Sequence, residues 1–100
     1  MTTKRSTRGY ITSPEVTERL KFLAKSRGVT YDAIGDYIHS HYMRRKPSRQ
    51  AISELLSNRA SLSEYKMKEL AYAIGVTDAE MQELIDLHRK TVRLVQTLNR

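Results

Sequence analysis

Residues 20–38, LKFLAKSRGVTYDAIGDYI, set the pattern of the fold because they contain the end of one helix, a turn and the start of another. Gly28 favours the left-handed backbone with which many helices end. Thr30 can cap the next helix with its hydroxyl, and Ile34 and Ile38 begin the buried face of that helix. The apolar positions of the helix before Gly28 recur at helical spacing. They are Val16, Leu20, Leu23 and Ala24.

The same signals extend in both directions from this stretch. Ser13 followed by Pro14 predicts the start of the first helix, because proline suits the first helical position. Ser48 predicts the start of a third helix after the second. We expect the buried stripe of this third helix to be Ala51, Ile52, Leu55 and Leu56.

Two further helices are indicated by pairs of residues at capping-box spacing. Ser61 with Glu64 predicts the start of a fourth helix, and Gly75 predicts its end. Thr77 with Glu80 predicts the start of a fifth, which has no clear stop signal afterwards. No stretch alternates as a β-strand does, so the sequence predicts an all-α fold of five helices.

Composition argues against an enzyme. The chain of 100 residues is long enough for one domain and has no cysteine, which excludes disulfides and thiol catalysis. It carries no metal-ligand, phosphate-loop or nucleophile motif. His39 and His41 would point to different sides of a helix, so they are not expected to chelate one metal ion. We expect no enzyme activity, no cofactor and no metal. Without a long apolar run or a signal peptide, we also expect no membrane span and a cytoplasmic location.

The net charge of +7 lies at the two ends of the chain. We divide the sequence into a basic arm (1–12), a core domain (13–87) and a basic C-terminal extension (88–100). The body between the two ends is neutral overall, although residues 40–60 form a local basic cluster with Glu54 as their one acidic residue. Its members are Arg44, Arg45, Lys46, Arg49 and Arg59. Three basic clusters in one small chain favour a polyanionic partner.

Three stretches resemble the Cro/CI-type (XRE-like) helix-turn-helix domains of phage repressors. They are residues 20–38 quoted above, SRQAISELLSNR (48–59) and KMKELAYAIGVTDAEM (66–81). The resemblance implies a five-helix repressor-like domain that binds double-stranded DNA as a homodimer on a two-fold operator. It therefore implies a transcriptional regulator, most simply a repressor of the phage or mobile-element type, associated with the nucleoid.

The third helix corresponds to the recognition helix of that family. Its outward residues are then the candidates for contacts with DNA bases, because such a helix enters the major groove by its N-terminal half. These candidates are Arg49, Gln50, Ser53 and Glu54. Residues at helix starts and in flanking loops are candidates for phosphate contacts. These are Thr30, Tyr31, Arg44, Arg45, Lys46, Ser48, Asn58 and Arg59.

The segment before the third helix departs from the family. Nine residues separate Ile38 from Ser48, whereas the usual turn has roughly three or four and contains a glycine. We expect the second helix to continue to about Arg44 and the chain to turn at Lys46-Pro47. Gly35 is expected where the second and third helices cross closely. Ile38, Ile52 and Leu55 would hold the two helices together there.

Each end of the chain has two interpretations. The arm with Lys4, Arg5 and Arg8 is either a disordered tail or a segment that enters the minor groove. The apolar residues at the end of the fifth helix either form a dimer interface or fold back onto the first helix. They are Val92, Val95 and Leu98.

Two other functions fit the same sequence. One is an antitoxin that uses a similar DNA-binding domain and also binds a protein partner. The other is a module for protein or membrane surfaces, because Arg89, Lys90 and Arg93 alternate with apolar residues on the C-terminal helix.

Overall fold

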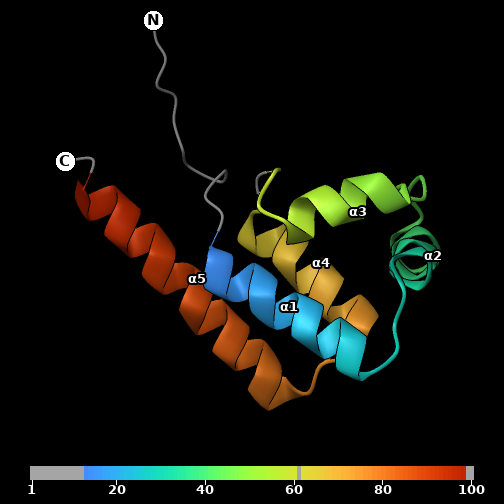
Figure 1. The fold of residues 1–100 in the computed structure, drawn as a ribbon, viewed down its shortest axis with the longest axis horizontal. Helices are drawn as coiled ribbons and strands as arrows, with labels where there is room; N and C mark the ends of the chain where they lie inside the picture. Colours follow the sequence, from blue (N-terminus) through green and yellow to red (C-terminus); the bar gives the residue numbers. More distant parts are fainter. Residues whose placement is uncertain (1–12, 61, 99–100) are drawn as a thin grey trace, which may run out of the picture.

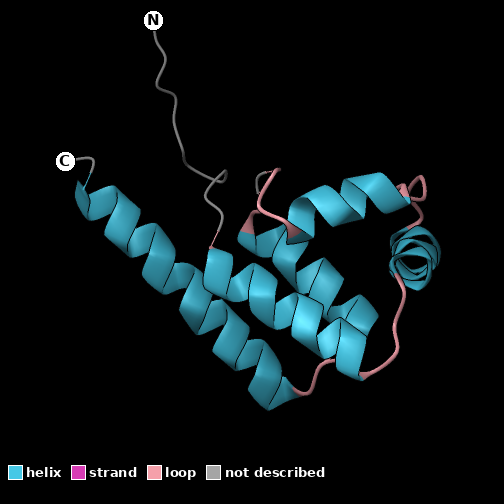
Figure 2. Cartoon of the chain, in the orientation of Figure 1, coloured by secondary structure: helices cyan, strands magenta, loops and turns pink. Residues whose placement is uncertain are grey.

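The computed structural model describes residues 13–60 and 62–98, the last four of these by their backbone only. Within these ranges the secondary structure consists of α-helices, and no strand is present (Figure 2). The helices are α1 (Pro14–Ser26), α2 (Tyr31–Tyr42), α3 (Arg49–Leu56), α4 (Glu64–Ile74) and α5 (Asp78–Leu98). The prediction of an all-α protein with five helices is therefore confirmed.

Helix α1 lies at the centre of the bundle, between α5 on one side and α3 and α4 on the other (Figure 1). Helix α2 packs against α3 and α4. A single hydrophobic core joins these elements, because each helix contributes at least one side chain that is 0–1% exposed. One such residue from each helix, in chain order, is Leu20, Ile34, Ile52, Leu70 and Leu84.

Most of the expected helix starts are confirmed. The Ser13 hydroxyl accepts a hydrogen bond from the backbone N–H of Val16 at 3.4 Å, and Thr30 and Ser48 cap α2 and α3 in the same way. The predicted capping box at α5 is also present. Glu80 N–H donates to the Thr77 hydroxyl at 3.1 Å, and Thr77 N–H donates to the Glu80 carboxylate at 2.8 Å.

The expected start of α4 is wrong by two positions. Its N-cap is Ser63, whose hydroxyl accepts from Lys66 N–H at 3.2 Å, and Ser61 lies outside the described residues. Leu62 and Met67, both fully buried, occupy the two positions of a hydrophobic staple around this cap. The burial of Leu62 in the core therefore fixes the register of the helix start. Glu64 is left free to pair with another helix.

The buried stripe of α3 is narrower than expected. Ile52 and Leu56 are fully buried and Leu55 is half-buried, but Ala51 is exposed. The prediction for Ala51 was wrong because α3 is short and is covered by its neighbours on one side only. Ala51 and Leu55 instead line a cavity beside α4.

The long segment between α2 and α3 also differs from the expectation. Helix α2 ends at Tyr42, short of Arg44, because Met43 adopts a left-handed backbone with φ of 54°. Residues 43–48, which we call the connector, then lead to α3. Gly35 is buried as expected, but its close neighbour is the connector rather than α3. A Cβ atom on Gly35 would lie 3.0 Å from the carbonyl oxygen of Pro47.

Within the ranges given above, none of the helices combines the length and the apolar character needed to cross a bilayer.

Candidate nucleic-acid interface

The N-terminal half of α3 presents two of the predicted base-reading side chains to solvent. Arg49 is 70% exposed at its side chain, and Gln50 is exposed as well. Gln50 lies on the side of α3 away from Ile52 and Leu56, which anchor the helix in the core, and Arg49 is exposed at the first position of the helix. Ser53 is only half-buried, so it also has a surface that a ligand can reach. This half of α3 is therefore a polar, accessible ridge on a rigid support.

Glu54 has two structural roles on this helix. Its carboxylate accepts a hydrogen bond from Gln50 Nε2 at 3.3 Å. Its carbonyl oxygen accepts from the backbone N–H of Arg59 at 2.9 Å and of Ala60 at 3.3 Å. These bonds fold the loop after α3 back onto the helix end, with Asn58 in a left-handed conformation at φ 61°. The loop therefore holds Arg59 close to the C-terminal end of α3.

Two carboxylates of α2 lie beside the basic residues of this region. Lys46 Nζ donates to Asp36 Oδ1 at 2.9 Å, and this hydrogen bond raises the pKa of Lys46. Arg49 Nε is 3.8 Å from Asp32 Oδ1, which is a loose contact. All four side chains are largely exposed, so these pairs contribute little to stability. They orient the basic groups and can be exchanged for other anions at small cost.

The candidate phosphate-binding residues fall into three groups. The hydroxyls of Thr30 and Ser48 already accept hydrogen bonds from their own helices, so these residues would offer mainly backbone N–H groups to an anion. Tyr31 is half-buried against the core. Arg45 and Arg59 are exposed, and neither forms an ion pair within the described part of the chain. These two arginines are the most available cations next to α3.

Arg44 is directed elsewhere. Its guanidinium pairs with the carboxylate of Glu69 on α4 at 2.5 Å and lies 5.5 Å from the centre of the Tyr42 ring. Glu69 is only 4% exposed, so this ion pair crosses from the connector into the edge of the core. Sequence reasoning missed this pair, because 25 residues separate its members and no local pattern joins them.

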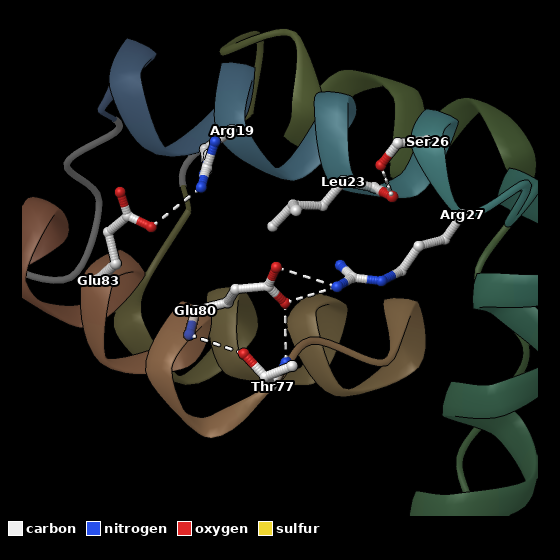
Figure 3. A network of polar contacts seen from close by, with 7 residues as sticks. All are labelled: Arg19, Leu23, Ser26, Arg27, Thr77, Glu80 and Glu83. Atoms are coloured by element: carbon white, nitrogen blue, oxygen red, sulfur yellow. Dashed lines mark hydrogen bonds and ion pairs between the residues drawn. The ribbon is translucent and has the colours of Figure 1, made fainter.

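The N-terminal half of α5 is attached to α1 by a polar network on another side of the molecule (Figure 3). Arg27 donates to both oxygens of Glu80, at 2.8 and 3.0 Å, and Arg19 pairs with Glu83 at 3.2 Å. The hydrogen bond from the Thr77 backbone N–H is the main cause that lowers the pKa of Glu80, and the hydrogen bond from Arg27 lowers it further. These contacts extend the Thr77 capping box into an attachment between two helices.

Further along α5, Arg89 forms a two-pronged pair with Glu64 of α4, with both N–O distances at 2.9 Å. The same pairing lowers the pKa of Glu64 and raises that of Arg89. Thr91 donates to Ser13 at 3.0 Å, so α5 follows α1 to the start of that helix. His88 is buried between these contacts, and burial lowers its pKa.

These contacts hold α5 against α1 as far as Thr91, which is where the apolar stripe with two interpretations begins. Val92 is half-buried and Leu94 is 57% exposed. The side chains of Val95 and Leu98 lie outside the description, as do the arm residues Lys4, Arg5 and Arg8.

The paired histidines of α2 are part of local packing. His41 stacks on Tyr37 with ring centres 4.0 Å apart, and His39 Nδ1 contacts the carbonyl oxygen of Arg44. A search of the described residues finds no group of three or more His, Asp or Glu side chains placed to hold a metal ion.

Comparisons of the chain with protein-family models, with curated proteins and with solved structures find no match.

Proposed function

We propose that the chain is a sequence-specific DNA-binding transcriptional regulator of the Cro/CI type, most simply a repressor, in which α3 is the recognition helix. The observation that carries the proposal is the exposed Arg49 and Gln50 on the N-terminal half of α3. Contact between α2 and α3, which a helix-turn-helix pair requires, also supports the proposal.

Arginine and glutamine are suited to reading bases in the major groove. Arg49 can donate two hydrogen bonds to guanine, and Gln50 can form a bidentate pair with adenine. Each such pair discriminates against a wrong base by about 1–3 kcal/mol. Arg49 can leave Asp32 for this purpose at little cost, because their contact is long and exposed.

Phosphate contacts come from both ends of α3. Arg45 lies on the connector before the helix, and Arg59 lies on the loop after it. Because neither has an acidic partner in the described structure, each can release counterions from DNA without first breaking an ion pair. Lys46 can add a third contact if it exchanges Asp36 for a phosphate.

The same proposal includes a homodimer formed through the end of α5. In the view of Figure 1 the last turns of α5 extend past the start of α1, and they carry the exposed Leu94. A second copy packed on this segment would place two α3 helices on one two-fold operator. Leu94→Glu should shift the sedimentation mass from dimer to monomer. Phe22→Glu, at an equally exposed position of α1, should leave the mass unchanged.

DNA binding is tested by selecting bound fragments from random duplexes and then measuring affinity by fluorescence anisotropy. Arg49→Ala and Gln50→Ala should relax the preference for the selected sequence. Arg45→Ala should weaken binding to all sequences alike. Lys25→Ala is the charge-matched control, since Lys25 is an exposed, unpaired lysine on α1 within the described structure.

Salt dependence gives an independent measurement. If about six phosphates are neutralised, affinity should fall roughly 10³-fold between 50 and 200 mM salt. Affinity that does not change with salt would contradict the proposed phosphate contacts. A loss for Lys25→Ala as large as that for Arg45→Ala would show that only the total charge matters.

A further inference from the structure

A groove lies beside α3, on the side that faces the connector and α4. Its volume is about 410 Å³, which is within the usual range for small-molecule sites. Much of its wall is apolar and comes from three different parts of the fold. Ile38 ends the buried face of α2, Leu55 belongs to α3, and Leu70 belongs to α4, while Pro47 closes the connector side. The groove is therefore shaped by tertiary packing rather than by one loop.

One charged group of this groove has an unsatisfied hydrogen-bonding atom. Glu69 lines the groove and is 4% exposed. Arg44 pairs with its Oε1 atom, but its Oε2 atom is buried and accepts no hydrogen bond in the described structure. A buried carboxylate oxygen without a donor destabilises the folded state. A donor in the groove would reach this oxygen after a turn of the Glu69 side chain toward the groove, because the atom is closed to solvent in the structure.

Two cations line the same groove. Arg45 and Lys66 are exposed, and no acidic side chain in the described ranges forms an ion pair with either. They come from the connector and from the first turn of α4. Together with the Arg44–Glu69 pair, they give the groove a net positive charge. An anionic group is therefore favoured beside them.

We infer that the groove beside α3 binds a small organic acid with an apolar body, a carboxylate and a hydroxyl group. The apolar body would pack on Ile38, Leu55 and Leu70. The carboxylate would pair with Arg45 and Lys66, and the hydroxyl would donate to the unsatisfied oxygen of Glu69. This inference does not depend on DNA binding, although a ligand at this site would contact α3 and compete for Arg45.

The ligand class is tested with three related probes of the same size and the full-length chain. They are 4-hydroxyphenylacetate, phenylacetate, which lacks the hydroxyl, and 4-hydroxyphenethylamine, which carries an ammonium in place of the carboxylate. Binding is followed by titration of backbone amide signals in NMR spectra. The hydroxy acid should bind with shifts at Leu55 and Leu70, phenylacetate should bind roughly tenfold more weakly, and the amine should not bind.

Two pairs of variants locate the site. Ala51→Phe should fill the mouth of the groove and abolish binding of the hydroxy acid, whereas Ala79→Phe makes the same change at an exposed position of α5 and should not. Arg45→Gln should weaken binding and Lys25→Gln should not. Circular dichroism verifies that each variant retains its helices.

Equal affinity for all three probes, or no binding of any of them, would overturn the inferred ligand class. Binding that survives in a folded Ala51→Phe variant would overturn the inferred site. These measurements contain no DNA, so their failure is distinct from a failure of the proposed regulator function.

Discussion

Replacing Gly35 with alanine sets two effects of similar size against each other. Gly35 lies in the interior of α2, where alanine should stabilise the helix by about 1 kcal/mol through its better helix propensity. However, the added Cβ would lie 3.0 Å from the carbonyl oxygen of Pro47 and 3.2 Å from Lys46 Cε. The lysine can move aside, but the oxygen belongs to the backbone of the connector.

Overpacking of this kind usually costs about 1–3 kcal/mol. We therefore expect Gly35→Ala to lower the free energy of unfolding by about 1 kcal/mol, or the melting temperature by roughly 4–8 °C. Urea denaturation followed by circular dichroism measures this change. Ser40→Gly and Ser40→Ala, compared at an exposed position of the same helix, supply the propensity term without the contact. If Gly35→Ala stabilises the chain as much as alanine does over glycine at Ser40, the argument from the connector is wrong.

Three further perturbations follow from the contacts of single residues. Burial lowers the pKa of His88 below its usual 6.5. Below pH 6.5 the unfolded chain therefore binds a proton more readily than the folded chain does. Stability should therefore be retained above pH 6.5 and decrease as the pH falls. With falling pH, the urea midpoint should decrease less for His88→Leu than for the unsubstituted chain, whereas His41→Gln should behave like the unsubstituted chain. Thr77→Ala removes the hydroxyl that caps α5 and should cost about 1 kcal/mol in thermal unfolding. Thr77→Ser keeps a hydroxyl and should cost less; equal losses would contradict the capping role. Asp32→Asn removes a carboxylate 3.8 Å from Arg49 and should strengthen DNA binding about two- to fivefold in anisotropy titrations. The control Asp86→Asn on α5 should leave binding unchanged. A weaker complex for Asp32→Asn would show that Asp32 positions Arg49 for binding.

Features that depend on neighbours in the chain were predictable from the sequence. Thr30, Ser48 and the Thr77–Glu80 box act within one helical turn, so residue type and spacing were sufficient to locate these helix starts. Gly75 ends α4 with φ of 87°, which few other residues adopt. Serine signals are less selective, and the choice between Ser61 and Ser63 depended on which position let Leu62 enter the core.

Features that depend on contacts between distant segments were not predictable. The need for a small residue at Gly35 was expected, but the neighbour that requires it is Pro47, at the end of an atypical connector. The exposure of Gln50 followed from helical periodicity, and that of Arg49 from its place at the first position of α3. The partners of Arg44 and Arg49 could not be predicted in this way, because they are carboxylates on other helices. Charge counting therefore located the basic region but not which of its members are already paired.

The hydrogen bond between Thr91 and Ser13 joins residues 78 positions apart. Closing a loop of that length has an entropic cost, which the packing of α5 on α1 offsets. During synthesis, the face of α1 that α5 covers therefore stays exposed until most of the chain has been made. We expect α1 to α4 to form a looser assembly first, and the arrival of α5 to be the step that gives the domain its cooperative stability.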